Sequence, residues 1–200
     1  MPVCTHTLMH RHDPRTGSFV EANEFGTHYE QFRDISDYGT SFDEETYERK
    51  GHDFDSLSSD LSQITDFIEQ LNEMPMLRPI GTLLVIEGKT CKNTMLSHLP
   101  PAKDTMVDLL IKLGRADTAK LLEEFNHASK SIKVHKGEQT LDDFADFVDK
   151  RNVQRDGEEK RGTWFEVTMK IYDLLHFYNA QVPTDDKANK KYLETAKEWV

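Results

Sequence analysis

The chain has 200 residues, enough for one domain or two small ones, and it is polar, with 36% hydrophobic and 30% charged residues. A formal net charge of -11 opposes non-specific binding to nucleic acid or to an anionic membrane, so we expect neither partner. Two cysteines, Cys4 and Cys91, give no disulfide framework, and no apolar run is long enough to cross a bilayer, so we expect a cytoplasmic setting.

Residues 1–52 are rich in His, Asp, Glu, Gly, Thr and Ser and show no sustained apolar period. Such a segment buries little surface to offset the entropy that is lost on ordering. We expect it to be largely irregular, with one short helix around residues 27–34. If it docks on a partner, its scattered aromatic residues would make the contact: Phe19, Phe25, Tyr29, Phe32, Tyr38, Phe42 and Tyr47.

A regular apolar pattern begins after Asp55. Apolar residues recur there at three- and four-residue steps, which is the spacing of one helical face: Leu57, Leu61, Ile64, Phe67, Ile68 and Leu71. Pro75 and Pro79 end this predicted helix, because each proline removes a backbone donor and restricts the residue before it. A short extended run follows over residues 82–86.

The middle of the chain predicts further helices. One begins near Lys103, with Met106, Leu109, Leu110 and Leu113 on its inner face, and is interrupted at Gly114. Asp117 can cap its continuation, whose inner face holds Leu121, Leu122 and Phe125. Thr140 to Asp143 resembles a capping box with Asp in place of Glu, and Phe144, Phe147 and Val148 follow at helical spacing.

A polar run over residues 151–162 separates that helix from the C-terminal part. The next apolar set again fits one helical face: Trp164, Val167, Ile171, Leu174, Leu175 and Tyr178. Val182 and Pro183 break it, and Thr184 or Asp185 caps a final helix. On that helix we expect one shared face for Tyr192, Ala196 and Trp199.

These patterns together predict an all-α fold, an elongated bundle of antiparallel helical hairpins with one short extended segment. The expected domain organisation is an irregular N-terminal region over residues 1–52 and a helical domain over residues 53–200. Large side chains at helical spacing usually pack in a core, and less often serve as hot spots for a partner. The expected structural or interaction anchors are Phe144, Phe147, Trp164, Ile171, Leu174, Leu175, Tyr178, Tyr192 and Trp199.

Three features of the sequence are candidates for catalytic or ligand-binding sites. The stretch from Gly81 to Thr90 reads like a phosphate-binding loop, but the first glycine of that motif should stand at position 83, which is Leu83. Four possible metal ligands, Cys4, His6, His10 and His12, lie too close together for two ligand pairs at the ends of a folded loop. Neighbouring carboxylates such as Asp142 and Asp143 are better explained as solvated charges at a helix end. We therefore expect no enzyme, no metal site and no cofactor.

Five stretches between residues 57 and 200 resemble the tail of dynein heavy chains, in the region just before the linker. They read IEQLNEMPMLRPIG, IGTLLVIEGKTCKNTMLSHLP, LLIKLGRADTAKLLEEFNHASKSI, TLDDFADFVDKRN and KIYDLLHFYNAQVPTDDKANKKYLETAKEW. The last is the most specific, with a Tyr-x-Leu-Leu helix, a Val-Pro-x-Asp-Asp break, and then Tyr192 and Trp199. The second matches a short extended segment before a lysine and leucine-leucine-proline run, represented by Lys92, Met95-Leu96 and Leu99-Pro100. In the family an Asp commonly follows the Val, whereas Ile86 and Glu87 stand here.

The resemblance implies a non-catalytic helical segment of a microtubule motor, closer to the axonemal type than to the cytoplasmic one. It implies dynein intermediate or light chains, or other heavy-chain segments, as partners, and a place on the cytoskeleton or in the cilium. Nothing in the chain resembles the ATPase ring or the microtubule-binding stalk. Because the chain ends inside the last helix of the pattern, we expect a fragment, a truncated gene product or a chain that completes its fold against a partner.

Two other hypotheses remain open from the residues. The chain could be an independent acidic helical adaptor that binds a partner through its aromatic-rich first 50 residues. It could also be a metal- or nucleotide-binding enzyme. The spacing of the candidate metal ligands and of the candidate phosphate-binding loop disfavours this third hypothesis.

Overall fold

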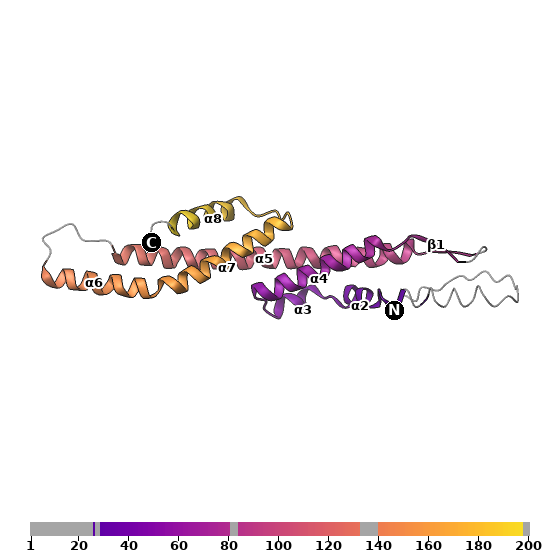
Figure 1. Cartoon of the computed structure of the whole chain (residues 1–200), viewed down its shortest axis with the longest axis horizontal. Helices are drawn as coiled ribbons and strands as arrows, with labels where there is room; N and C mark the ends of the chain where they lie inside the picture. Colours follow the sequence, from indigo (N-terminus) through magenta and orange to yellow (C-terminus); the bar gives the residue numbers. More distant parts are fainter. Residues whose placement is uncertain (1–25, 27–28, 81–83, 133–139, 198–200) are drawn as a thin grey trace. The chain divides into compact units, whose positions relative to one another are not determined.

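The computed structural model describes Gly26 and residues 29–80, 84–132 and 140–197, and over these residues the fold is all-α, as predicted (Figure 1). The helices are α2 (Arg33–Ser41), α3 (Glu44–Arg49), α4 (Phe54–Glu73), α5 (Lys89–Ile132), α6 (Leu141–Asp156), α7 (Glu158–Phe177) and α8 (Thr184–Lys197). Two short strands, β1 (Leu77–Ile80) and β2 (Leu84–Glu87), stand between α4 and α5. Among the described residues, no helix is both long and apolar enough to span a membrane.

The chain divides into two compact units. Unit 1 comprises Met1–Gly51 and Ser59–Met106, and unit 2 comprises His52–Ser58 and Val107–Val200. Helices α4 and α5 therefore each contribute residues to both units.

Residues 33–41 and 44–49 in unit 1 are helical, so the described part of the segment expected to be largely irregular contains two helices, while residues 1–25 lie outside the described residues. In α3 the side chain of Asp43 accepts a hydrogen bond from the backbone N–H of Thr46, and Glu44 and Glu45 stand in the first turn. In α2 the apolar Ile35 is buried. Capping and tertiary burial thus stabilise two short helices whose composition alone did not reveal them. The start of the short helix expected around residues 27–34 lies outside the described residues.

The core of unit 1 lies between α2, α4 and the first part of α5. It consists of Phe32, Ile35, Leu71, Met74, Met95 and Leu99, with Tyr38 and Phe67 among the half-buried residues that pack against it. The ring of Tyr38 meets that of Phe67 edge to face, with centroids 5.5 Å apart. The predicted apolar face of α4 is thereby confirmed, since Leu61, Ile64 and Leu71 are each 0% exposed.

Lysine 92 is a buried cation of unit 1, at the point where α4 ends. Its Nζ donates hydrogen bonds to the backbone carbonyl oxygens of Asn72, at 2.8 Å, and of Met74, at 3.2 Å. The last carbonyl groups of a helix lack partners within the helix and form its negative end. Lys92 therefore satisfies backbone groups at the C-terminal end of α4 from the first turn of α5.

Residues 84–86 of the expected extended segment over residues 82–86 lie in strand β2 of a β-hairpin, and residues 82 and 83 lie outside the described residues. Strand β2 pairs antiparallel with β1, and Leu77 stands opposite Glu87. Strand β1 contains Pro79, which argues against a strand in a sequence pattern, but a two-stranded sheet has only edge strands, where proline is tolerated. Gly88 follows β2, and its N–H donates to the carbonyl oxygen of Met76 at 2.8 Å.

Helix α5 is continuous over 44 residues, which corrects both its expected start near Lys103 and the expected interruption at Gly114. Pro100 and Pro101 lie inside the helix and are exposed, so the carbonyl groups that they leave without an amide donor can face water. Leu99 and Ala102 on either side are each 0% exposed. Burial of these flanking side chains offsets the cost of two prolines in the helix.

In unit 2 the capping box predicted at the start of α6 is confirmed. The Thr140 hydroxyl accepts from the N–H of Asp143, and the Asp143 carboxylate accepts from the N–H of Thr140. The polar run over residues 151–162 is helical and does not separate α6 from α7 as expected, because only Gly157 lies between them. Arg161 connects the two helices by donating to the side-chain oxygen and to the backbone oxygen of Gln154.

The core of unit 2 brings together α5, α7 and α8. Its buried cluster consists of Leu121, Phe125, Phe165 and Leu193, with Leu122, Trp164 and Met169 packed against it. Helix α7 ends at Phe177, and Asn179 adopts a positive φ of 53° in the turn that follows. Helix α8 begins at Thr184, and its first backbone bond runs from the N–H of Lys187 to the carbonyl of Pro183.

Candidate functional site: polar contacts between α5, α7 and α8

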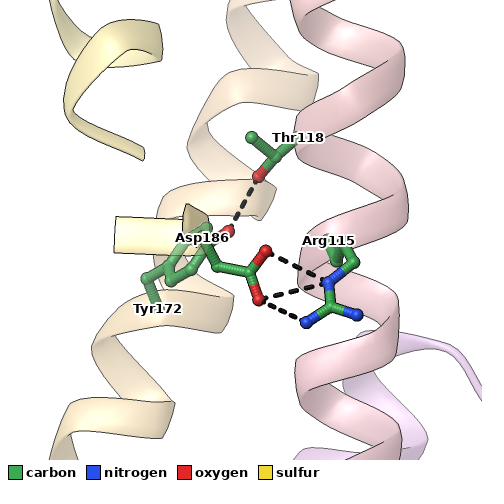
Figure 2. Close-up of polar contacts among 4 residues, drawn as sticks. All are labelled: Arg115, Thr118, Tyr172 and Asp186. Carbon is green, nitrogen blue, oxygen red and sulfur yellow. Dashed lines mark hydrogen bonds and ion pairs between the residues drawn. The ribbon is translucent and has the colours of Figure 1, made fainter. Parts of the chain in front are cut away.

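The described residues of unit 2 contain a cluster of four polar side chains, Arg115, Thr118, Tyr172 and Asp186, of which the last three are buried. Figure 2 shows these four side chains meeting from three helices, with Arg115 and Thr118 on α5, Tyr172 on α7 and Asp186 on α8. We call this set the polar cluster. Polar side chains far apart in the sequence contact one another here.

Arg115 and Asp186 form a forked ion pair. The Nε of Arg115 donates to Asp186 Oδ1 at 3.1 Å and to Oδ2 at 3.2 Å, and its Nη2 donates to Oδ2 at 2.8 Å. The Asp186 side chain is 6% exposed and that of Arg115 is 57% exposed, so the guanidinium shields a buried carboxylate on its solvent side. The hydrogen bonds and charge of Asp186 raise the pKa of Arg115 above its usual value. The Asp186 carboxylate also stands in the first turn of α8, where a helix favours negative charge.

Thr118 and Tyr172 form the second part of the polar cluster. Their hydroxyl oxygens lie 3.0 Å apart, and both residues are buried. Burial raises the pKa of the Tyr172 phenol, so the phenol stays neutral and can share a hydrogen bond with Thr118. On α8, the Lys190 ammonium lies 5.4 Å from the centroid of the Tyr172 ring, a cation–π distance. Tyr172 therefore contacts α5 through its hydroxyl and α8 through its ring.

Gly114 lies next to the polar cluster and allows α5 and α7 to approach closely. A Cβ atom at this position would lie 3.0 Å from Cγ2 of Ile171, which is 0% exposed. The glycine that seemed to interrupt the helix is instead a contact position inside it.

The side chains of the polar cluster satisfy one another's charge and hydrogen bonds. The guanidinium neutralises the carboxylate, and the two hydroxyl groups bond to each other, so no group is positioned as a nucleophile activated by a base. Among the described residues, no group of three or more His, Cys, Asp or Glu side chains is arranged to hold a metal ion. The cluster therefore fixes the positions of α7 and α8 on α5.

The expected anchor residues fall into three groups. Ile171 and Leu175 are each 0% exposed and lie in the core. Phe147, Trp164, Leu174 and Tyr178 are half-buried. Phe144 and Tyr192, at 59% and 57% exposed, are not core residues, so of the two expected roles they do not fill the structural one within the described residues. Trp199 lies outside the described residues.

The buried face of α7 is displaced from the predicted one by about one residue. It consists of Phe165, Thr168, Ile171, Tyr172 and Leu175. Helix α7 carries apolar residues on most of its circumference, so periodicity alone could not select the buried side. Over residues 184–195 of α8, whose burial is described, the buried positions are Asp186 and Leu193, and only the second is apolar. Because one of these buried residues is polar, a hydrophobicity pattern does not identify the buried face of α8.

The structure bears on one of the two motifs considered above as ligand sites, the loop that ends at Gly88. The Gly88 amide, which a phosphate-binding loop would direct at a phosphate, donates to Met76 within the hairpin. Cys4, His6, His10 and His12 lie outside the described residues. An open hollow on α5 is lined by Ala119, Leu122, Glu123, Asn126, His127 and Lys130.

No family model matches the sequence of the chain, and no curated protein matches it either.

Proposed function

We propose that the chain is a non-catalytic structural segment of a dynein-heavy-chain-like tail, which contributes to assembly of a motor complex and transmits force within it. Its partners would be dynein intermediate or light chains, or other segments of a heavy chain. Its place would be on the cytoskeleton, in a cilium or axoneme. The proposal starts from the resemblance in the sequence and is supported by where the resembling residues lie.

The observation that carries the proposal is the polar cluster. Arg115 and Thr118 belong to the resembling stretch on α5, whereas Tyr172 and Asp186 belong to the most specific stretch, as the Tyr of Tyr-x-Leu-Leu and the second Asp of Val-Pro-x-Asp-Asp. These four residues contact one another in pairs across at least 54 positions of the sequence. Motif residues that meet in the fold are expected when the motif encodes a packed helical unit.

The second resembling stretch supports the proposal in unit 1. Its lysine, Lys92, is buried and bonds to carbonyl groups at the end of α4, and Met95 and Leu99 lie in the core of that unit. These positions have packing roles, which suits a segment whose function is mechanical. A helix as long as α5, joined to its neighbours by buried contacts, is a suitable element for transmitting displacement.

The alternative, an acidic adaptor that binds through its N-terminal aromatic residues, has less support. Of those residues, Phe32 is buried in unit 1, Tyr38 packs on Phe67, and Phe42 contacts Tyr47 with ring centroids 5.2 Å apart. The Tyr47 hydroxyl donates to the Asp60 carboxylate at 2.5 Å. Aromatic side chains engaged in this way expose less surface to a partner, and Phe19 and Phe25 lie outside the described residues.

Affinity capture from an extract of ciliated cells tests the proposal. The tagged 200-residue chain is the bait, and recovered proteins are identified by mass spectrometry. Ile171→Asp, which places a charge at a fully buried position, is the unfolded control, and Glu123→Gln, on the exposed side of α5, is the folded one. We expect the parent and the Glu123→Gln variant to recover dynein subunits and the Ile171→Asp variant to recover none. A folded parent that recovers no dynein subunit would contradict the proposal.

A further inference from the structure

Helix α6 presents an exposed apolar stripe. Leu141, Phe144 and Val148 follow one another at three- and four-residue steps, so they lie on one side of the helix. They are 87%, 59% and 37% exposed. Beyond Val148 the same line continues with Arg151 and Arg155, so the apolar part of the stripe is about two turns long.

A row of carboxylates runs parallel to this stripe. Asp142, Asp149 and Asp156 repeat every seven residues and are exposed. The positions between the row and the stripe hold the small side chains of Ala145 and Asn152. Among the residues that the structure describes, none of the three carboxylates takes part in an ion pair. A long cationic side chain lying over the stripe could reach them across the small residues.

The other side of the stripe faces the protein. Phe147 and Gln154, again seven residues apart, are the half-buried residues of α6. The capping box at Thr140 fixes the beginning of the helix, and the bonds from Arg161 to Gln154 hold its end against α7. Helix α6 is therefore a defined helical surface, with an apolar stripe between its packed side and its acidic row.

We propose that this surface, formed by the stripe Leu141, Phe144 and Val148 and the row Asp142, Asp149 and Asp156, binds a basic amphipathic helix of a partner protein. The partner helix would place its apolar residues on the stripe and its Lys or Arg side chains over the acidic row. The net charge of -11 on the chain attracts such a partner from a distance and repels a second copy of the chain. This inference holds whether or not the chain belongs to a motor.

The proposal is tested with a labelled synthetic peptide of about 18 residues, roughly five helical turns. The peptide carries Leu at the positions of one helical face and Lys elsewhere. Its binding to the full chain is measured by fluorescence anisotropy. Two control peptides have the same length, one with Glu in place of Lys and one with the Leu positions scrambled. We expect saturable binding of the first peptide alone, weakening as salt is added.

Matched variants locate the site. The double variant Leu141→Ser, Phe144→Ser removes the stripe, and Val153→Ser, at a 68% exposed valine on another side of α6, is its control. We expect the double variant to raise the Kd about tenfold or more and the control to leave it unchanged. All three positions of these substitutions are exposed, so the variants should fold, which circular dichroism checks.

The acidic row has its own control. The variant Asp142→Asn, Asp149→Asn, Asp156→Asn is compared with Asp37→Asn, Glu69→Gln, Asp104→Asn, which removes the same charge from exposed positions of unit 1. Only the first should weaken binding and reduce its salt dependence. Equal losses in both would mean non-specific attraction and would overturn the proposal. Light scattering tests a second outcome. If the chain does not bind the peptide but forms a dimer that Phe144→Ser disrupts, a second copy of the chain occupies the surface and the proposal is overturned.

Discussion

Replacing Gly114 by alanine tests how closely α5 and α7 pack in unit 2. The added Cβ would lie 3.0 Å from Cγ2 of Ile171 and 3.8 Å from Cζ of Tyr172. Ile171 is 0% exposed and cannot swing into solvent, so the neighbouring helix must move by a few tenths of an ångström. Gly162, inside α7, is the matched control, because a Cβ there meets nothing within 4 Å.

The expected magnitudes follow from two opposing effects. Replacing a glycine inside a helix by alanine stabilises it by about 0.5–1 kcal/mol. Overpacking a well-filled core costs about 1–3 kcal/mol. Gly162→Ala should therefore raise the free energy of unfolding by about 0.5–1 kcal/mol, whereas Gly114→Ala should leave it unchanged or lower it by up to about 2 kcal/mol. The two variants should differ by about 1–3 kcal/mol.

Urea unfolding followed by tryptophan fluorescence measures this difference in the right part of the chain. Both tryptophans, Trp164 and Trp199, belong to the sequence of unit 2, and Trp164 packs against its core cluster. Thermal unfolding gives an independent reading, at about 2–4 °C per kcal/mol for a chain of this length. If the two alanine variants are stabilised equally, α5 and α7 do not approach each other closely at Gly114.

Three further predictions concern other contacts of the two units. Lys92→Met should lower the free energy of unfolding of unit 1 by about 1.5–3 kcal/mol, because two carbonyl groups at the end of α4 lose a charged donor. Urea unfolding measures this loss, and Lys89→Met, at an exposed position, is the control. Burial, together with the charge of Asp60, raises the pKa of Tyr38 from 10.0 to about 12. Its stabilising contribution is therefore complete below about pH 10 and is lost as the pH rises through about 12, and Tyr38→Phe should remove that part of the alkaline loss in a pH series of urea unfolding. Arg115→Ala should leave the buried carboxylate on α8 without its partner. The amide hydrogen-exchange rate should therefore increase more in α8 than in α7. Unchanged exchange in α8 would mean that the ion pair does not fix this helix.

The sequence was sufficient to predict helices with a regular apolar face. Helix α4 and the capped start of α6 are where periodicity and capping residues placed them. Helices α2 and α3 were missed because their sequences are polar and they depend on the Asp43 cap and on burial of Ile35 in a tertiary core. The polar run over residues 151–162 predicts a break for the same reason, since solvated helical turns carry no apolar pattern.

The polar cluster could not be predicted from local sequence. Asp186 stands at the start of a helix, where acidic residues are usually solvated and favoured by the helix dipole. Its partner Arg115 is 71 positions away, and no local pattern pairs two such residues. Gly114 alone predicts a helix break. Its actual role depends on the contact with Ile171 of another helix, which the local sequence does not show. These features depend on contacts between helices, which a pattern within one helix does not contain.

The most direct test of the proposed function is the size and location of the native protein. An antibody raised against the 200-residue chain is used on an immunoblot of fractionated ciliated cells, and the detected band is sequenced by mass spectrometry. We predict a band far larger than the 23.2 kDa of this chain, enriched in the axonemal fraction and containing motor-domain peptides. A single band near the mass of the chain, absent from axonemes and free of dynein subunits, would contradict the proposal.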